Sequence, residues 1–129
     1  MGREAFETAA RTGDMDAMRA ALSLDVVFRG PAFPDQIVGR DRVSAILATA
    51  FGKAYQDFEY TGVVVGAART VLLFTARVGE YSLEGAQVLG FNAEDLVSEL
   101  VVMVRPAPAA AALGHAILAA LGLDSASQT

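Results

Sequence analysis

The chain has 129 residues, a net charge of −5, one histidine and no cysteine. This length suits a single domain spanning residues 1–129, and the lack of cysteine excludes disulfides and thiol catalysis. The 10 Lys and Arg residues form no cluster, which argues against a nucleic acid or an anionic membrane as partner. A lone histidine leaves too few ligands for a typical zinc site, so we expect no metal and no cofactor.

Hydrophobic residues make up 53% of the chain, above the usual share for a soluble domain. Some apolar surface is therefore expected to face a pocket or a partner. The first residues lack a signal-peptide pattern, and no apolar run reaches the roughly 20 residues that span a bilayer. We expect a cytoplasmic location.

In the first part of the chain, apolar residues recur at the spacing of helices. Gly13 suits the end of a first helix because glycine accepts a positive φ, and Asp14 suits the N-cap of a second helix. The apolar stripes are Phe6, Ala9 and Ala10 in the first helix and Met15, Met18 and Leu22 in the second.

A first strand is predicted over Leu24–Arg29, followed by an irregular loop with Gly30, Pro31 and Pro34. A third helix is predicted after Gly39. Its apolar positions recur every three or four residues, at Val43, Ile46, Leu47, Ala50, Phe51 and Ala54.

In the second half of the chain, apolar and polar residues alternate in the way that is typical of strands. The four predicted strands are Phe58–Val65, Thr70–Val78, Tyr81–Phe91 and Leu96–Arg105. Their connections are short, which favours antiparallel pairing. A C-terminal helix is predicted over 107–123, with strong helix formers from Ala109 to Leu123, and a frayed tail over 124–129. This order of elements predicts an α+β fold.

Several landmarks resemble a known family. They are the break at Gly13-Asp14, the strand end 26–28 before Pro31, Gly39-Arg40 at a helix start, the strand 88–92 and the closing strand 101–106. Over residues 3–106 this pattern is similar to the SnoaL-like branch of the nuclear transport factor two-like superfamily. The resemblance implies a strongly curved antiparallel sheet wrapped around three N-terminal helices to form a cone with a ligand pocket inside, and leaves the C-terminal helix as an addition.

Strand alternation sorts the sheet residues onto two faces. The face that the resemblance makes concave is almost purely apolar: Leu72, Phe74, Ala76, Val78, Gln87, Leu89, Phe91, Leu100, Val102 and Val104. The convex face mixes apolar and charged residues: Val71, Leu73, Thr75, Arg77, Glu84, Ala86, Val88, Glu99, Val101, Met103 and Arg105.

This chain lacks the catalytic side chains of a ketosteroid isomerase at the corresponding positions. That chemistry needs a carboxylate base and an oxyanion hole made by a tyrosine and a neutral acid. The resemblance places Phe6 at the tyrosine, Gly30 at the base and Gln87 at the neutral acid. We therefore expect no ketosteroid isomerase activity and interpret Gln87 as a recognition group that donates a hydrogen bond to a ligand carbonyl.

Other polar residues are weaker candidates for a role in catalysis or ligand binding. The resemblance places Asp35 near the pocket entrance, although an Asp after Pro is most often a turn residue. A surface position is the simpler interpretation of His115. Arg40 is expected to pair with a nearby carboxylate rather than bind an anion, the candidates being Asp14, Asp16 and Asp25.

Two tyrosines flank the join between the third helix and the following strand. A buried hydroxyl at Tyr55 or Tyr60 needs a partner, and a backbone carbonyl is favoured over a ligand.

The leading hypothesis is a small-molecule binding domain whose apolar cone accepts a hydrophobic or aromatic ligand, with no catalytic residues assigned. The expected ligand-binding residues are Phe28, Phe33, Phe74, Gln87, Leu89, Leu100 and Val102. One alternative is an isomerase, a polyketide cyclase-like or an epoxide hydrolase-like enzyme that uses Asp35 or another loop carboxylate. A second alternative is an assembly module whose cone is filled by side chains.

The convex face predicts a homodimer. Its apolar residues would otherwise form a contiguous patch on water, which monomers rarely expose. The patch residues are Val71, Leu73, Val88, Val101 and Met103, and the charged residues expected to pair around a two-fold axis are Arg77, Glu84, Glu99 and Arg105.

Overall fold

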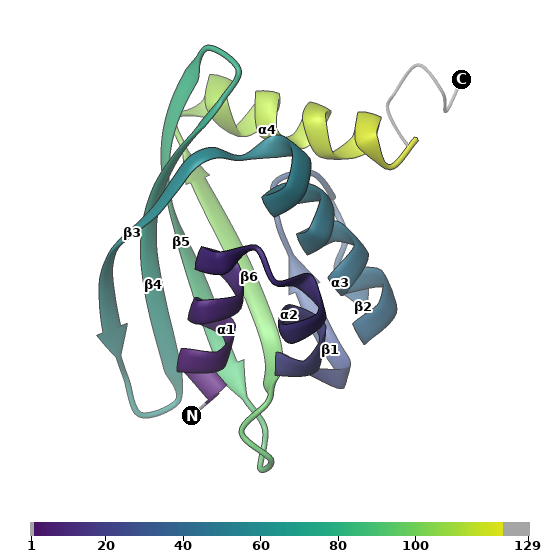
Figure 1. The fold of residues 1–129 in the computed structure, drawn as a ribbon, viewed down its shortest axis with the longest axis vertical. Coiled ribbons are helices and arrows are strands. Elements are labelled where there is room, and N and C mark those ends of the chain that lie inside the picture. Colours follow the sequence, from purple (N-terminus) through teal and green to yellow (C-terminus); the bar gives the residue numbers. More distant parts are fainter. Residues whose placement is uncertain (1, 123–129) are drawn as a thin grey trace.

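The computed structural model describes residues 2–122, which form a curved six-stranded sheet with helices on one side (Figure 1). In chain order the elements are α1 (Gly2–Thr12), α2 (Met15–Ala21), β1 (Leu22–Arg29), β2 (Ile37–Val38), α3 (Arg40–Thr49), the π-helix η1 (Ala50–Ala54), β3 (Gln56–Val65), β4 (Arg69–Val78), β5 (Tyr81–Phe91), β6 (Val97–Arg105) and α4 (Ala107–Ala120). The α+β fold predicted from the sequence is confirmed.

Helices α1 and α2 form the expected hairpin. Gly13 between them has a φ of +72°, and the Asp14 side chain caps α2 by accepting a hydrogen bond of 3.0 Å from the Ala17 N–H. Leu22, predicted on the second helix, instead begins β1 and is fully buried there.

The third predicted helix consists of α3 and η1 in continuous succession. The Tyr55 N–H donates to the Ala50 carbonyl at 2.8 Å, a bond one residue longer than in an α-helix. This widened turn places the Tyr55 ring against β4, 5.8 Å from the Phe74 ring centroid.

The strand order in the sheet is β2-β1-β6-β5-β4-β3. All pairings are antiparallel except that of β1 with β6, which is parallel and corrects the expectation of a purely antiparallel sheet. No short turn joins β1 to β6, so turn length could not indicate this direction. The two-residue strand β2 was too short to leave an alternating pattern.

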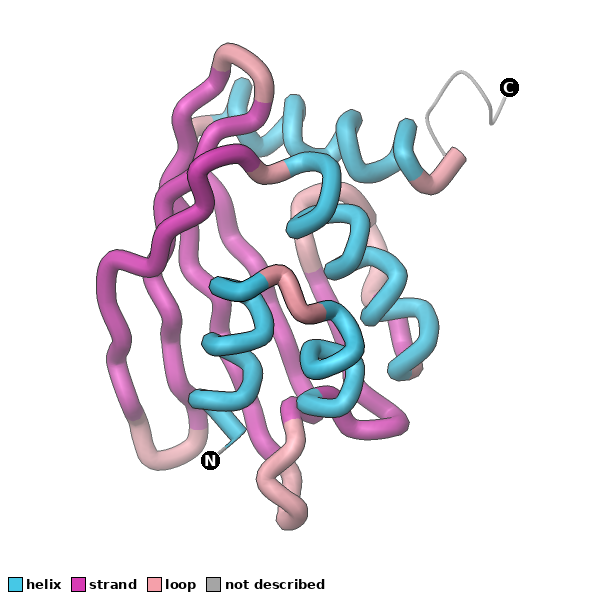
Figure 2. The backbone as a smooth tube through the Cα atoms, in the orientation of Figure 1, coloured by secondary structure: helices cyan, strands magenta, loops and turns pink. Residues whose placement is uncertain are grey.

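Helix α4 crosses the end of the sheet next to η1 (Figure 2). It begins at Ala107, where the predicted C-terminal helix 107–123 starts, and Pro108 is tolerated in its first turn because no N–H partner is needed there. Leu123 and the predicted tail 124–129 lie outside the described residues. Within residues 2–122, no helix has the length and apolarity to cross a membrane.

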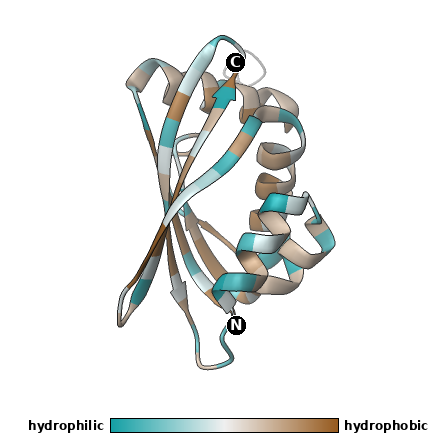
Figure 3. Ribbon diagram, turned by 60° about the vertical axis from the view of Figure 1, so that its left-hand side comes forward, coloured by the Kyte–Doolittle hydropathy of each residue, from teal (hydrophilic) through white to brown (hydrophobic). Residues whose placement is uncertain are grey.

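The two faces of the sheet are sorted as the alternation predicted. Leu72, Phe74, Leu89 and Leu100 are almost completely buried beneath the helices, and in the described part of the chain, residues 2–122, the helices pack on this concave side of the sheet (Figure 3). The apolar core therefore lies between the concave face and the helices, and any internal site must lie in that layer.

Candidate functional site

A small, partly enclosed cavity lies inside the cone between the sheet, α3, η1 and α4. Its volume is about 20 Å³, enough for one water molecule. The residues that line it come from all four of these elements and from the β1–β2 region: Phe28, Pro31, Ile46, Leu47, Ala50, Phe51, Tyr55, Gln87, Val102, Leu113 and Ile117. The wall is apolar apart from the Gln87 amide and the Tyr55 hydroxyl.

Gln87 is a buried amide on the concave face, with a side chain only 1% exposed. Its Oε1 accepts a hydrogen bond of 2.7 Å from the Tyr60 hydroxyl. Tyr60 was expected to bond a backbone carbonyl, and this side-chain partner corrects that expectation. The bond occupies the carbonyl end of the Gln87 amide and leaves its nitrogen free to donate elsewhere.

Two donors at this site have no protein partner. Within residues 2–122, no hydrogen bond is formed by the Gln87 Nε2 group or by the Tyr55 hydroxyl, and both residues line the cavity. Neither atom is completely buried, since among residues 2–122 the Arg40 Nε is the fully buried side-chain polar atom without a partner, so both groups can donate to an acceptor placed inside the cavity.

Both tyrosines are held in their neutral form. Burial raises the pKa of the Tyr55 phenol, and burial followed by the nearby Glu7 carboxylate raises the pKa of Tyr60. Each hydroxyl therefore keeps its proton near neutral pH and can act as a hydrogen-bond donor but not as a base.

An aromatic cluster fills the cone beside the cavity. Five rings from η1, β3 and β4 lie with neighbouring centroids between 4.9 and 5.8 Å apart: Phe51, Tyr55, Phe58, Tyr60 and Phe74. Three of the six ring contacts are edge-to-face, two are tilted and one is stacked, which are the geometries that aromatic pairs prefer. Two of these rings, Phe51 and Tyr55, also line the cavity.

Helix α4 forms one wall through Leu113 and Ile117. Gly114 lies close to the β1–β2 loop, where a Cβ atom at this position would be 3.4 Å from the Ala32 Cα. No side-chain hydrogen bond or ion pair links residues 107–121 to the rest of residues 2–122. The helix is therefore held on the cone by apolar packing.

The structure brings together part of the predicted ligand-binding set. Phe28, Gln87 and Val102 line the cavity. Four others lie in the core around it rather than in its wall: Phe74, Leu89 and Leu100 are almost fully buried, and Phe33 is half-buried.

The positions compared with a ketosteroid isomerase contain no catalytic group. Phe6 is fully buried in the core. A Cβ atom at Gly30 would lie 2.6 Å from the Phe28 Cζ, so the phenyl ring occupies the space that a side chain there would need. Gln87 carries an amide that transfers no proton.

The loop and helix candidates lie away from the cavity. Asp35 and His115 are both exposed. The ion pair expected for Arg40 is not formed: Asp14 caps α2, Asp25 accepts from Ser23, and among residues 2–122 no ion pair involves Arg40. The Arg40 Nε is buried without a partner. No three His, Cys, Asp or Glu side chains in this part of the chain gather as metal ligands.

The sequence interpretation missed the contribution of the helices. Ile46, Leu47 and Phe51 were recognised as one apolar helix face, and α4 was predicted from its strong helix formers. Neither signal separates residues that line a cavity from residues that fill the core. Tyr55 was recognised as a buried hydroxyl in need of a partner.

Solved structures with this architecture include a steroid delta-isomerase from Pseudomonas aeruginosa, 30% identical, with a TM-score of 0.88 over 94% of this chain and 89% of that one. An uncharacterised protein with a cystatin-like fold from Silicibacter pomeroyi is 26% identical, with a TM-score of 0.88 over 97% of this chain and 88% of that one. A nuclear transport factor two-like protein of unknown function from Mesorhizobium loti is 12% identical, with a TM-score of 0.72 over 81% of this chain and 88% of that one, and supports the fold alone.

No curated protein matches the sequence. The SnoaL-like domain matches residues 3–111. Because this match covers most of the chain and the fold agrees, the protein belongs to the SnoaL-like family, with a nuclear transport factor two-like cone.

Proposed function

We propose that this protein binds a small hydrophobic ligand that carries one hydrogen-bond acceptor, inside the cone. The observation that carries the proposal is the Gln87 amide, which belongs to an almost completely buried residue in the wall of an apolar cavity and whose Nε2 group forms no hydrogen bond within residues 2–122. A carbonyl oxygen placed in the cavity satisfies this donor, and the Tyr55 hydroxyl offers a second bond. Apolar walls and a few convergent polar groups are typical of ligand sites.

Ligand entry requires a wall to move, because about 20 Å³ holds only one water molecule. Helix α4 is the wall held by apolar contacts alone, through Leu113 and Ile117. An aromatic ligand replaces those contacts with its own apolar surface, so outward displacement of α4 breaks no side-chain hydrogen bond or ion pair between residues 107–121 and the rest of residues 2–122.

The similarity to a steroid delta-isomerase supports a flat, carbonyl-bearing ligand class. It does not support the same reaction, because Gly30 carries no base and the Phe28 ring fills the space beside it. Asp35, the catalyst considered in the enzymatic alternative, is exposed and does not line the cavity. The proposal is therefore binding rather than turnover.

A pair of naphthalenes tests the proposal by isothermal titration calorimetry: 2-acetylnaphthalene carries the carbonyl, and 2-ethylnaphthalene is its matched hydrocarbon. The ketone is expected to bind about tenfold more tightly, as one hydrogen bond of ~1–1.5 kcal/mol predicts. Gln87→Leu should remove this preference. Ser82→Ala, an exposed change on the same strand, is the control and should preserve it.

The small cavity favours one second candidate, an assembly module whose cone is filled. In that case neither compound binds, even when Leu113→Ala opens the wall of the cavity. Binding of both compounds without a preference for the ketone would contradict the role of Gln87.

A further inference from the structure

A groove of about 530 Å³ lies outside the cone, between the hairpin of α1 and α2 and the loop that joins β5 to β6. We call it the hairpin groove. The residues that line it come from the two helices and this loop: Gly2, Ala5, Ala17, Ala20, Ala21, Glu94, Asp95 and Leu96. It shares no lining residue with the cavity inside the cone and is therefore a separate feature of the surface.

The floor of the hairpin groove consists of methyl groups. Both helices line it with glycine and alanine only, and Ala5, Ala17 and Ala20 are exposed. The loop adds the half-buried side chain of Leu96. Helices that meet through small side chains approach each other to about 8 Å, so this surface accepts another helix at close range.

The loop at the edge of the groove has a fixed shape. The Asn92 Oδ1 accepts hydrogen bonds of 3.0 Å from the N–H groups of Glu94 and Leu96. The Asp95 Oδ2 accepts a bond of 2.7 Å from the Gly2 N–H, which ties the loop to α1. A Cβ atom at Gly2 would collide with the Asp95 carbonyl oxygen, so glycine permits this approach. A preformed edge loses little conformational entropy when a partner binds.

The edge of the hairpin groove is negatively charged. Glu94 and Asp95 line it, and Asp16 lies one helical turn before Ala20 on α2. Among the described residues that line the groove, none is Lys, Arg or His. Within residues 2–122, no ion pair involves Asp16 or Glu94. These carboxylates therefore attract a positively charged partner.

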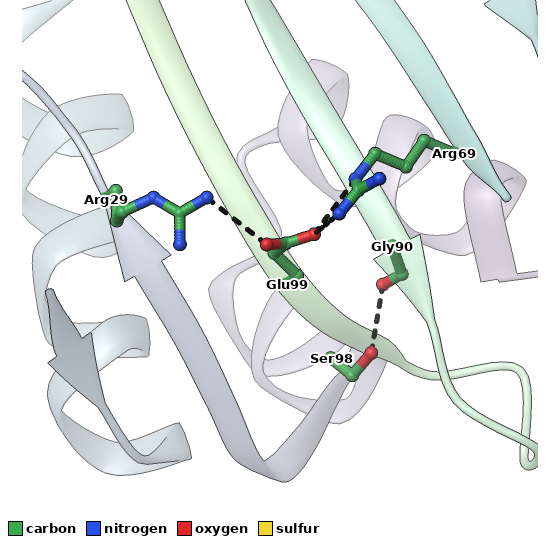
Figure 4. A network of polar contacts seen from close by, with 5 residues as sticks. All are labelled: Arg29, Arg69, Gly90, Ser98 and Glu99. Atoms are coloured by element: carbon green, nitrogen blue, oxygen red, sulfur yellow. Dashed lines mark hydrogen bonds and ion pairs between the residues drawn. The ribbon is translucent and has the colours of Figure 1, made fainter.

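Arginines elsewhere in the structure neutralise the carboxylates beside them. On the sheet, Arg29 and Arg69 both pair with Glu99 (Figure 4). On α2, the Arg19 side chain pairs with Asp41 of α3. The carboxylates at the hairpin groove have no paired Lys or Arg side chain within residues 2–122, so a cation from another molecule can pair with them.

We propose that the hairpin groove docks a basic amphipathic helix of a partner protein. Apolar side chains of that helix fill the groove over the alanines, and Lys or Arg side chains on its flanks reach Glu94, Asp95 and Asp16. A helix suits the groove because helices and a loop line it, rather than a strand edge that would bond an extended peptide. Helix α1 has 11 residues and a length of about 16 Å, which matches roughly three turns of the partner helix.

A second copy of this chain does not have the required helix. Helix α4 is strongly apolar but contains no Lys or Arg, and α1, α2 and α3 each mix acidic and basic residues. A lipid surface is disfavoured because its anionic head groups would meet the acidic edge of the groove. The partner that fits is a different protein with basic residues clustered on a helix.

A pair of synthetic peptides tests the docking. The first is a capped helix of about 14 residues with leucine on one face and lysine on the other, and the second has glutamate at every lysine position. Fluorescence anisotropy should show binding of the lysine peptide that weakens as the salt concentration rises, and no binding of the glutamate peptide. No binding of the lysine peptide at about 100 μM, or equal binding of both peptides, would overturn the proposal.

Two variants with the same change in net charge locate the site. Glu94→Lys replaces an attraction by a repulsion and should weaken binding of the lysine peptide by about three- to tenfold. Glu80→Lys, an exposed change in the turn between β4 and β5, is the matched control and should weaken binding by less than about twofold. Equal losses in the two variants would show attraction by net charge alone and contradict docking in the groove.

A neutral substitution tests the apolar floor. Ala20→Gln places a longer polar side chain in the groove and should weaken binding of the lysine peptide by about three- to tenfold. Ala45→Gln, an exposed change on α3, is the matched control and should leave the affinity unchanged. Far-ultraviolet circular dichroism identifies any variant that has lost its fold. A folded Ala20→Gln variant with the affinity of the wild type would overturn the proposal.

Discussion

The Tyr60 hydroxyl donates a 2.7 Å hydrogen bond to the Gln87 Oε1, and the two side chains reach each other from β3 and β5 across the intervening strand β4. The bond fixes the orientation of the amide, since the oxygen is turned toward Tyr60. The nitrogen is then the end available at the cavity. A structural bond inside the protein thus presets the group that we propose for ligand recognition.

The first prediction concerns the coupling of this pair. Gln87→Leu leaves the Tyr60 hydroxyl buried without a partner and should lower the free energy of unfolding by about 1–3 kcal/mol. Tyr60→Phe should lower it as well. The double variant should be less destabilised than the sum of the two, because both polar groups are removed together. Denaturant unfolding measures all four proteins, and strictly additive effects would contradict the bond.

The second prediction concerns stability at alkaline pH. The pKa values of Tyr55 and Tyr60 are raised in the folded protein, so this stabilising effect is complete below the unfolded pKa of about 10 and is lost as the pH rises above it. The unfolded chain releases protons that the folded chain retains. The free energy of unfolding should therefore fall by up to ~1.4 kcal/mol per pH unit for each tyrosine.

Phenylalanine variants identify the residues responsible for the fall in the free energy of unfolding at alkaline pH. Tyr55→Phe and Tyr60→Phe should each reduce the loss of stability between about pH 10 and 11, as measured by urea unfolding. Tyr81→Phe is the control because the Tyr81 side chain is exposed. An unchanged slope in both buried variants would show that other groups cause the alkaline destabilisation.

Much of the fold could be predicted from local patterns. Strand β5 has the predicted bounds Tyr81–Phe91, and the Gly13-Asp14 break lies between α1 and α2. These features depend on alternation, capping and turn chemistry over a few residues. The parallel pairing of β1 with β6 joins residues about 70 positions apart, such as Val27 and Glu99, and no local signal encodes it.

The candidate site was less predictable. Alternation placed Gln87 correctly on the buried face, but its bond with Tyr60 joins residues on non-adjacent strands and depends on the curvature of the sheet. The π-turn that directs Tyr55 toward β4 has no distinct sequence pattern. The volume of the cavity depends on the summed packing of helix residues such as Leu113, which hydrophobic spacing identifies only as buried.

The third prediction concerns ketosteroid isomerase activity. No conversion of a 5-ene-3-ketosteroid should be detected by absorbance of the conjugated product. A missing general base alone removes about 10²- to 10⁴-fold of rate, and Gly30 has no space for one beside the Phe28 ring. Turnover by the wild type that Gln87→Leu abolishes would contradict this prediction and favour the enzymatic alternative.

The fourth prediction concerns α4 as the movable wall. Leu113→Ala removes buried side-chain atoms at the cavity and should lower the free energy of unfolding by about 2–5 kcal/mol. The same change makes room for a ligand, so 2-acetylnaphthalene should bind the variant more tightly than the wild type. His115→Ala is the matched control, since His115 is exposed on the same helix and should change neither property. If Leu113→Ala lowers stability while ketone affinity stays the same or falls, the ligand does not occupy the space beneath α4.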